Sequence, residues 1–97
     1  MANDYLLKVP EILVLLIRNL HPVIKADIRV ALHFLIKNPN GGKVLKEELH
    51  GLRSYRVKRY RIIYRFAAPE KILEIVAIGP RKNIYEETFK IISREGK

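Results

Sequence analysis

The fold is indicated most directly by one stretch of the sequence, residues 52–66, which reads LRSYRVKRYRIIYRF. From Tyr60 to Phe66, apolar or aromatic residues recur at every second position, which is the pattern of a β-strand buried on one face. Arg61 and Arg65 fall on the other face of that strand. This pattern predicts a rigid, positively charged surface, and the other segments are expected to support or complete it.

A β-hairpin results if Lys58 and Arg59 form a two-residue loop between strands at 52–57 and 60–66. The register then pairs Val57 with Tyr60, Arg56 with Arg61 and Tyr55 with Ile62. The face that helices would cover carries Tyr55, Val57, Tyr60, Ile62, Tyr64 and Phe66, and the opposite face carries Arg56, Arg61 and Arg65. Like charges directly opposite each other destabilise a sheet by about 0.2–1 kcal/mol, which a fold tolerates where an anion is bound. Two-residue loops favour Gly, Asn or Asp, so this register rests on the strand pattern and not on the loop.

Charge is distributed unevenly along the chain. The 97 residues carry a formal net charge of +9. Residues 43–97 hold fourteen Lys and Arg against seven Asp and Glu, whereas residues 1–42 hold five against three. A chain of this length forms one domain, 1–97, with a single core. A basic surface concentrated in one half is suited to a polyanion such as nucleic acid or an acidic protein.

Several function classes are disfavoured by composition. The chain has no cysteine, so disulfides and thiolate metal sites are excluded. Its histidines are scattered without the spacing of a metal site, and no glycine-rich phosphate loop is present, so we expect neither a metal nor another cofactor. The N-terminus lacks the pattern of a secretory signal, and the longest apolar run, Ile12 to Ile17, is too short to span a bilayer. We therefore expect a cytoplasmic protein without a membrane partner.

The first half of the chain predicts a strand and two helices. Residues 5–9 are expected to form a short strand, after which Pro10 opens a helix, since a proline at the first helical position loses no hydrogen bond. Apolar spacing over 12–20 favours this helix over the alternative of a buried strand. A clearer helical pattern covers 23–37 and ends in the turn-forming residues 38–42. Two helices joined in this way present an apolar face that must cover a sheet.

The second half predicts the sheet and a last helix. Residues 43–51 are expected to be mostly irregular, and 72–78 is the most hydrophobic strand, suited to the interior of a sheet. Residues 83–93 have helical spacing. The order is β-α-α-β-β-β-α, which predicts an α+β fold with two N-terminal helices packed on a small antiparallel sheet.

The same residues carry a resemblance to a known family. The pattern YR-x-x-YR at 60–65, together with IG-x-R-x-x-x-Y at 78–85, resembles the RelE/ParE superfamily of bacterial and archaeal toxins. The helical hairpin that ends at Asn38-Pro39 matches the first half of that family. The resemblance covers nearly the whole chain and implies a RelE-like fold.

The resemblance also implies a reaction and partners. RelE-type members cut mRNA in the ribosomal A site, and an antitoxin encoded beside them neutralises them. By this likeness the chain is an endoribonuclease toxin whose partners are a cognate antitoxin, the ribosome and mRNA. The catalytic positions are Arg61, Arg81 and Tyr85, and the RNA-binding positions are Arg56, Lys58 and Arg65. The hairpin is shorter than in the best-known RelE members, which leaves open whether Lys58 lies on the strand or in the turn.

Two other functions remain open for this fold. ParE-like members inhibit gyrase without these catalytic residues, and a basic binding module of the same fold would lack toxicity altogether.

Individual residues also have interpretations that involve no function. Arg56 and Arg65 are alternatively solvated sheet charges, Tyr64 is expected in the core, and Tyr85 is alternatively a helix residue packed on the sheet.

Ribonuclease chemistry agrees with the residue types. RNA is cleaved when its own 2′-OH attacks the adjacent phosphate, and cations that stabilise the developing charge make a metal unnecessary. Arginine suits this role because its planar fork binds two phosphate oxygens together. Arg56 and Arg61 would hold the phosphate, and Arg81 would stabilise the transition state or the leaving oxygen. Tyr85 would stack on a base or accept the 2′-OH proton.

Overall fold

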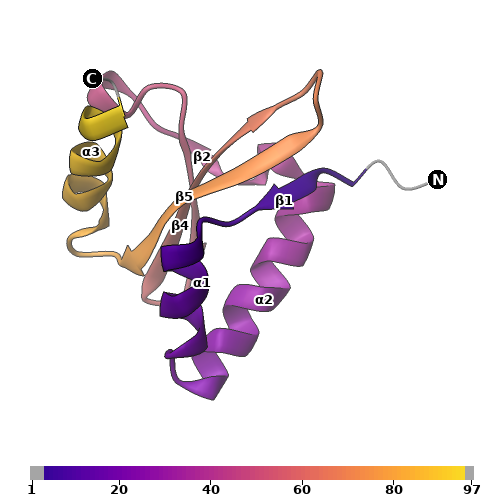
Figure 1. Ribbon diagram of the computed structural model, residues 1–97, viewed down its shortest axis with the longest axis vertical. Coiled ribbons are helices and arrows are strands. Elements are labelled where there is room, and N and C mark those ends of the chain that lie inside the picture. Colours follow the sequence, from indigo (N-terminus) through magenta and orange to yellow (C-terminus); the bar gives the residue numbers. More distant parts are fainter. Residues whose placement is uncertain (1–3, 96–97) are drawn as a thin grey trace.

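Three layers make up the structure, a computed structural model that describes residues 4–95. A sheet lies between the helical pair α1–α2 on one face and α3 on the other (Figure 1). The helices are α1 (Glu11–Arg18), α2 (Pro22–Lys37) and α3 (Ile84–Glu95), with short 3-10 turns η1 (Pro39–Gly41) and η2 (Glu47–Leu49). The strands are β1 (Leu6–Lys8), β2 (Lys43–Val44), β3 (Arg53–Val57), β4 (Tyr60–Ala67) and β5 (Ile72–Pro80).

The sheet has five strands in the order β1-β5-β4-β3-β2. The α+β fold class and the packing of the two N-terminal helices are confirmed. One part of the prediction was wrong, because the sheet is mixed: β1 pairs with β5 in parallel, with Leu6 opposite Ile72, while the other pairs are antiparallel. Residues 43–51, expected to be mostly irregular, contribute the two-residue edge strand β2. The hydrophobic strand β5 lies inside the sheet, as expected.

Prolines mark the starts of the first two helices. The helix α1 confirms the predicted helix over the alternative buried strand, and Pro10 lies at its N-cap, one residue before the first helical position that was predicted for it. Pro22 is the first residue of α2, where its missing N–H costs no hydrogen bond. His21 caps this helix, since its Nδ1 accepts a hydrogen bond of 3.1 Å from the backbone N–H of Val23. The predicted range 23–37 is therefore one residue short at its start.

The β3–β4 hairpin has the predicted register. Arg56 lies opposite Arg61 and Val57 opposite Tyr60. The turn contains Lys58 at φ 55°, in the left-handed region. That conformation costs a non-glycine residue about 1–2 kcal/mol, so contacts outside the turn must stabilise it.

Each face of the sheet has its own core. The six residues predicted for the helix-covered face all belong to or pack against the core beneath α1 and α2. Tyr64 is fully buried there, as expected. The opposite face is cationic only in part, because α3 covers its centre and buries Ile63, Val76 and Ile84. The predicted cations of that face are therefore separated into two groups by an apolar middle.

Candidate functional site

Arg61 is the centre of the candidate site. Its side chain projects from β4 on the α3 face, and its guanidinium carbon lies 5.7 Å from the ring centroid of Tyr85, the second residue of α3. Its Nη1 donates a hydrogen bond of 3.2 Å to Oγ of Ser54. The Tyr85 hydroxyl donates to the same oxygen at 3.4 Å. The structure thus brings together two of the three predicted catalytic residues.

Ser54 is a site residue that the sequence analysis missed. Its side chain is buried, and its hydroxyl oxygen accepts hydrogen bonds from both Arg61 and Tyr85. The alternation of β3 was the available signal, since Ser54 lies two residues before Arg56 and so on the same face. Lys43 was also missed: it lies directly opposite Ser54 on the edge strand β2 and adds a cation to this face.

One donor of Arg61 has no acceptor. Its Nε is buried and makes no hydrogen bond within residues 4–95. An unsatisfied buried donor costs about 1–3 kcal/mol, more when it is charged. Structures retain such groups mainly where they have a further role, and a charged donor on a cationic face favours an anionic ligand nearby.

Arg56 lies opposite Arg61 on β3, and Arg81 lies two residues after Gly79, the partner of Arg61 on β5. Arg56 is exposed, and its Nε donates to the carbonyl oxygen of Lys58 at 3.2 Å. Arg81 follows β5 directly, and its backbone N–H donates to the carbonyl oxygen of Arg59 at 2.9 Å. Within residues 4–95 the guanidinium of Arg81 has neither an ion pair nor a hydrogen bond. The turn therefore fixes the side chain of Arg56 and the backbone of Arg81. It leaves the Arg81 side chain free to bind a ligand.

Arg65 lies apart from this group. Its guanidinium is paired with Glu74 at 2.9 Å and with Glu95 at 3.3 Å. Burial lowers the pKa of Arg65, but the hydrogen bonds and charges of the two glutamates outweigh that effect and leave it raised. Four residues along a strand separate it from Arg61, about 13 Å. The structure does not bring Arg65 to the site, and its charge is already compensated.

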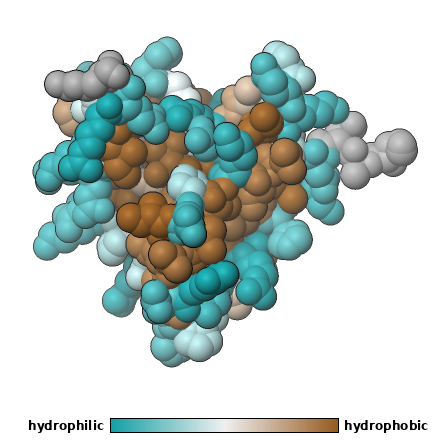
Figure 2. Space-filling model, viewed as in Figure 1, coloured by the Kyte–Doolittle hydropathy of each residue, from teal (hydrophilic) through white to brown (hydrophobic). Residues whose placement is uncertain are grey.

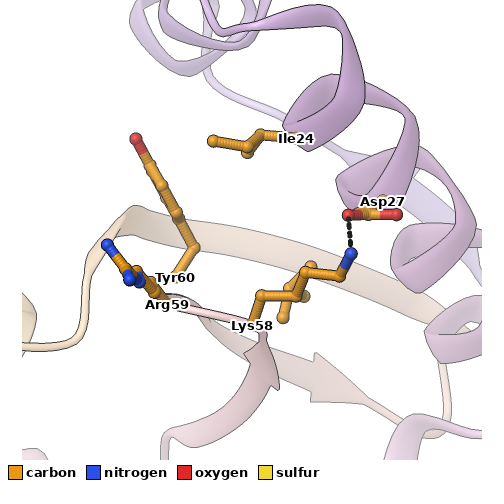
Figure 3. Close-up of a pocket in the computed structure, with 6 residues that line it drawn as sticks. Ile24, Asp27, Lys58, Arg59 and Tyr60 are labelled. Carbon is orange, nitrogen blue, oxygen red and sulfur yellow. Dashed lines mark ion pairs between the residues drawn. The ribbon is translucent and has the colours of Figure 1, made fainter.

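Lys58 lies in the turn and points to the other side of the sheet. Its Nζ is 3.2 Å from Oδ2 of Asp27 on α2 (Figure 3). The two residues border a cavity of about 190 Å³ that is otherwise lined by Ile24, Val57, Arg59 and Tyr60. The question that the sequence left open is answered: Lys58 is a turn residue, and it faces α2 while Arg61 faces α3.

A second hollow of about 280 Å³ adjoins Tyr85. Leu49 and Phe89 contribute its apolar walls, and Glu48 and Glu86 its polar ones. Carboxylates disfavour a phosphate but accept hydrogen bonds from amino groups. A planar, uncharged group is therefore better suited to this hollow than an anion.

The part of the chain that the structure describes shows neither a metal-ligand cluster nor a membrane-spanning helix. No group of three or more His, Cys, Asp and Glu side chains in residues 4–95 is arranged to hold a metal ion. Among the helices of the same residues, none has both the length and the apolar character to cross a membrane.

Comparison with protein families gives one match. The model of the ParE toxin of the type II toxin–antitoxin system parDE matches residues 12–85. No protein in the search of curated sequences matches the chain.

Solved structures with a similar fold include the toxin RelE and two toxin–antitoxin complexes. The RelBE2 toxin–antitoxin complex of Mycobacterium tuberculosis is similar at 28% identity and a TM-score of 0.71, over 80% of this chain and 92% of that one. A mutant of the E. coli toxin RelE in the free state has a TM-score of 0.74 at 13% identity, over 95% and 97% of the two chains. The archaeal RelE–RelB complex of Pyrococcus horikoshii has a TM-score of 0.68 at 24% identity, over 81% and 97%.

Proposed function

Because the chain belongs to the family of ParE toxins of type II toxin–antitoxin systems, we propose that it is a toxin of the RelE-like kind, an endonuclease that cuts mRNA in the ribosomal A site. The observation that carries this proposal is the group at the hairpin end: Arg61 over the Tyr85 ring, with Arg56 opposite it. A gyrase inhibitor that acts through a protein surface does not need such a group.

The proposed reaction uses the RNA's own 2′-OH. Its oxygen attacks the adjacent phosphorus, a new O–P bond forms, and the bond from phosphorus to the 5′-oxygen of the next nucleotide breaks. The 2′-OH loses its proton and the leaving oxygen gains one, so no external nucleophile is consumed. Negative charge grows on the phosphate oxygens, and cations held in place by the fold stabilise it. Arg56 and Arg61 bind those oxygens, and Arg81 stabilises the leaving oxygen.

We assign Tyr85 to stacking. One face of its ring carries the Arg61 guanidinium, and its hydroxyl donates to Ser54. The adjoining hollow has two apolar walls, Leu49 and Phe89, against which a base can pack. Base–aromatic stacking contributes about 1–3 kcal/mol per base.

The direct test is cleavage of mRNA on translating ribosomes, mapped by primer extension. We expect the wild-type chain to cut, and Arg61→Ala and Arg81→Ala to cut at least about a hundredfold more slowly, since each removes a charge-stabilising donor. Arg18→Ala, at an exposed arginine of α1, is the matched control and should keep full activity. A folded wild-type chain that leaves the mRNA intact contradicts the proposal.

Gyrase inhibition is the second candidate, because the matching family model is that of ParE. A supercoiling assay with purified gyrase separates the two functions. Inhibition of supercoiling together with intact ribosomal mRNA would reverse the assignment. Growth without arrest on expression of the folded chain would favour a basic binding module instead.

We also propose a cognate antitoxin as partner. Two of the similar structures are complexes of a toxin with its antitoxin. In this chain, α1 exposes Ile12, Leu15 and Leu16, with 74%, 49% and 38% of their surface accessible. Figure 2 shows apolar side chains gathered on the face where α1 lies in front. Ile12→Asp should weaken co-purification with the antitoxin, whereas Lys37→Asp, on an exposed end of α2, should not.

A further inference from the structure

The turn at Lys58 and Arg59 is hydrogen-bonded to two cationic residues of the site, Arg56 and Arg81. The carbonyl oxygen of Lys58 accepts a hydrogen bond from Arg56 Nε, and that of Arg59 accepts one from the backbone N–H of Arg81. These two carbonyl groups belong to adjacent residues. A displacement of the turn therefore moves the side chain of Arg56 and the backbone of Arg81 together.

The turn is not held in place by its own residues. Lys58 has φ 55°, a conformation that glycine and asparagine adopt readily and lysine does not. Two-residue hairpin turns with such geometry normally use Gly, Asn or Asp. An interaction outside the turn must therefore favour this arrangement over others.

Asp27 on α2 supplies that interaction. Its Oδ2 lies 3.2 Å from Lys58 Nζ; the side chain of Asp27 is 31% exposed and that of Lys58 is 71% exposed. The same oxygen is buried and accepts no hydrogen bond within residues 4–95. Lys58 therefore supplies the charge that compensates this oxygen. Figure 3 shows the lysine side chain extended from the turn to the helix.

We propose that Asp27 is a positioning residue: through Lys58 it holds the hairpin turn against α2 and thereby sets the positions of Arg56 and Arg81. It acts from the α2 side of the sheet, opposite the site, and touches no substrate. This role rests on the proposed function, in which those two arginines bind a phosphate. It gives Lys58 a structural task in place of direct RNA binding.

The first test is independent of activity. Hydrogen exchange of the Arg81 amide reports the bond to Arg59, and we expect Asp27→Asn to raise the exchange rate at least about fivefold while the melting temperature changes little. Glu70→Gln, an exposed carboxylate outside this contact, is the matched control and should leave the rate unchanged. An unchanged Arg81 exchange rate in Asp27→Asn overturns the inference.

The second test is charge reversal. Asp27→Asn and Lys58→Met should each lower kcat/KM for mRNA cleavage about tenfold, since displacements near 1 Å are sufficient for larger losses. The double variant Asp27→Lys, Lys58→Asp restores an ion pair of opposite direction and should recover most of the activity and the slow Arg81 exchange. A double variant that is no more active than Asp27→Asn or Lys58→Met overturns the inference. If the wild-type chain cuts no mRNA but the exchange results hold, the proposed function fails and the positioning of the two arginines stands.

Discussion

At the scale of single residues, Ser54 connects the cationic side chain of Arg61 with the aromatic side chain of Tyr85. Its oxygen accepts from Arg61 and Tyr85 at 3.2 and 3.4 Å. A small buried hydroxyl between two long side chains limits where both can lie. The orientation of Arg61 therefore depends on a residue that carries no charge itself.

Ser54→Ala should lower the rate of mRNA cleavage about tenfold, because Arg61 loses a contact that fixes its guanidinium. The free energy of unfolding should fall by about 1 kcal/mol, the net contribution of such a bond. Ser93→Ala, at an exposed position of α3, is the matched control. Equal cleavage rates for the two variants would show that Ser54 does not position Arg61.

Tyr64 holds the loop after α2 to the sheet. Its hydroxyl donates to the carbonyl oxygen of Pro39 at 2.7 Å and accepts from the N–H of Gly42 at 2.9 Å. A side chain at Gly42 has no room, since a Cβ there would lie 2.6 Å from the Tyr64 oxygen.

Tyr64→Phe should destabilise the fold by about 1–3 kcal/mol, because the buried Gly42 N–H loses its acceptor. Denaturant unfolding measures this loss, and Tyr5→Phe, whose ring packs edge-on against Phe66, is the control.

The same hydroxyl predicts a pH dependence. Burial raises the pKa of Tyr64 above its ordinary value of 10.0, and the Gly42 N–H and the charge of Arg53 offset only part of that rise. A group whose pKa is higher in the folded state stabilises the fold below its unfolded pKa and loses that contribution as pH rises further. The free energy of unfolding should therefore fall above about pH 10, and this part of the fall should be missing in Tyr64→Phe. An identical alkaline slope in both proteins would contradict the assignment.

At the scale of elements, Arg65 connects three of them. It projects from β4 and pairs with Glu74 on β5 and with Glu95 in the last turn of α3. Because Tyr85 lies in the first turn of the same helix, these ion pairs and the Tyr85 contacts fix opposite ends of α3.

Glu95→Gln should therefore loosen the end of α3. The side chains are 39% and 48% exposed, so solvent screening limits the effect to about 0.2–1 kcal/mol at low salt, and salt should reduce it further. Thermal unfolding at two salt concentrations measures the difference. Glu70→Gln, exposed between β4 and β5, is the control, and an equal effect of both changes would rule out a specific pairing.

The elements with strong periodicity were predicted from the sequence, and so was the short strand β1, although its parallel pairing was not. The alternation in β4 and the length of the hairpin determined its register, and the structure confirmed the pairing of Arg56 with Arg61. The strand β1 has only three residues, and its parallel pairing with β5 depends on where α1 and α2 return the chain. No local pattern reports that. The strand β2 was missed because two residues are too few to show a pattern.

The candidate site was predictable in part. Arg61 and Tyr85 were proposed from a resemblance, and the structure places them in contact. Charge alone did not distinguish Arg65 from Arg61, because only the tertiary structure shows that two glutamates compensate Arg65. Ser54 was overlooked because a serine in a strand carries no chemical signal until its partners are known. The catalytic and RNA-binding roles of the predicted residues stay predictions.

At the scale of the whole molecule, the three arginines of the candidate site and the exposed apolar side chains of α1 occupy different surfaces. Arg56, Arg61 and Arg81 gather where the hairpin and the end of β5 meet, whereas the exposed apolar residues of α1 lie on the other layer. One surface is therefore suited to a polyanion and another to a protein. A toxin arranged in this way can contact RNA and an antitoxin through separate surfaces.

The net charge of +9 raises the question whether RNA is attracted diffusely or bound at a few contacts. Each phosphate neutralised on a single strand adds about −0.7 to the slope of log K against log salt, so three arginine contacts predict a slope of about −2. Fluorescence anisotropy with a single-stranded RNA oligonucleotide measures it. Arg56→Ala, Arg61→Ala and Arg81→Ala should each make the slope less negative by about 0.7, while Arg29→Ala, exposed on α2, should not change it. Equal small changes in all four variants would mean that the whole surface attracts RNA and that the hairpin end makes no defined phosphate contacts.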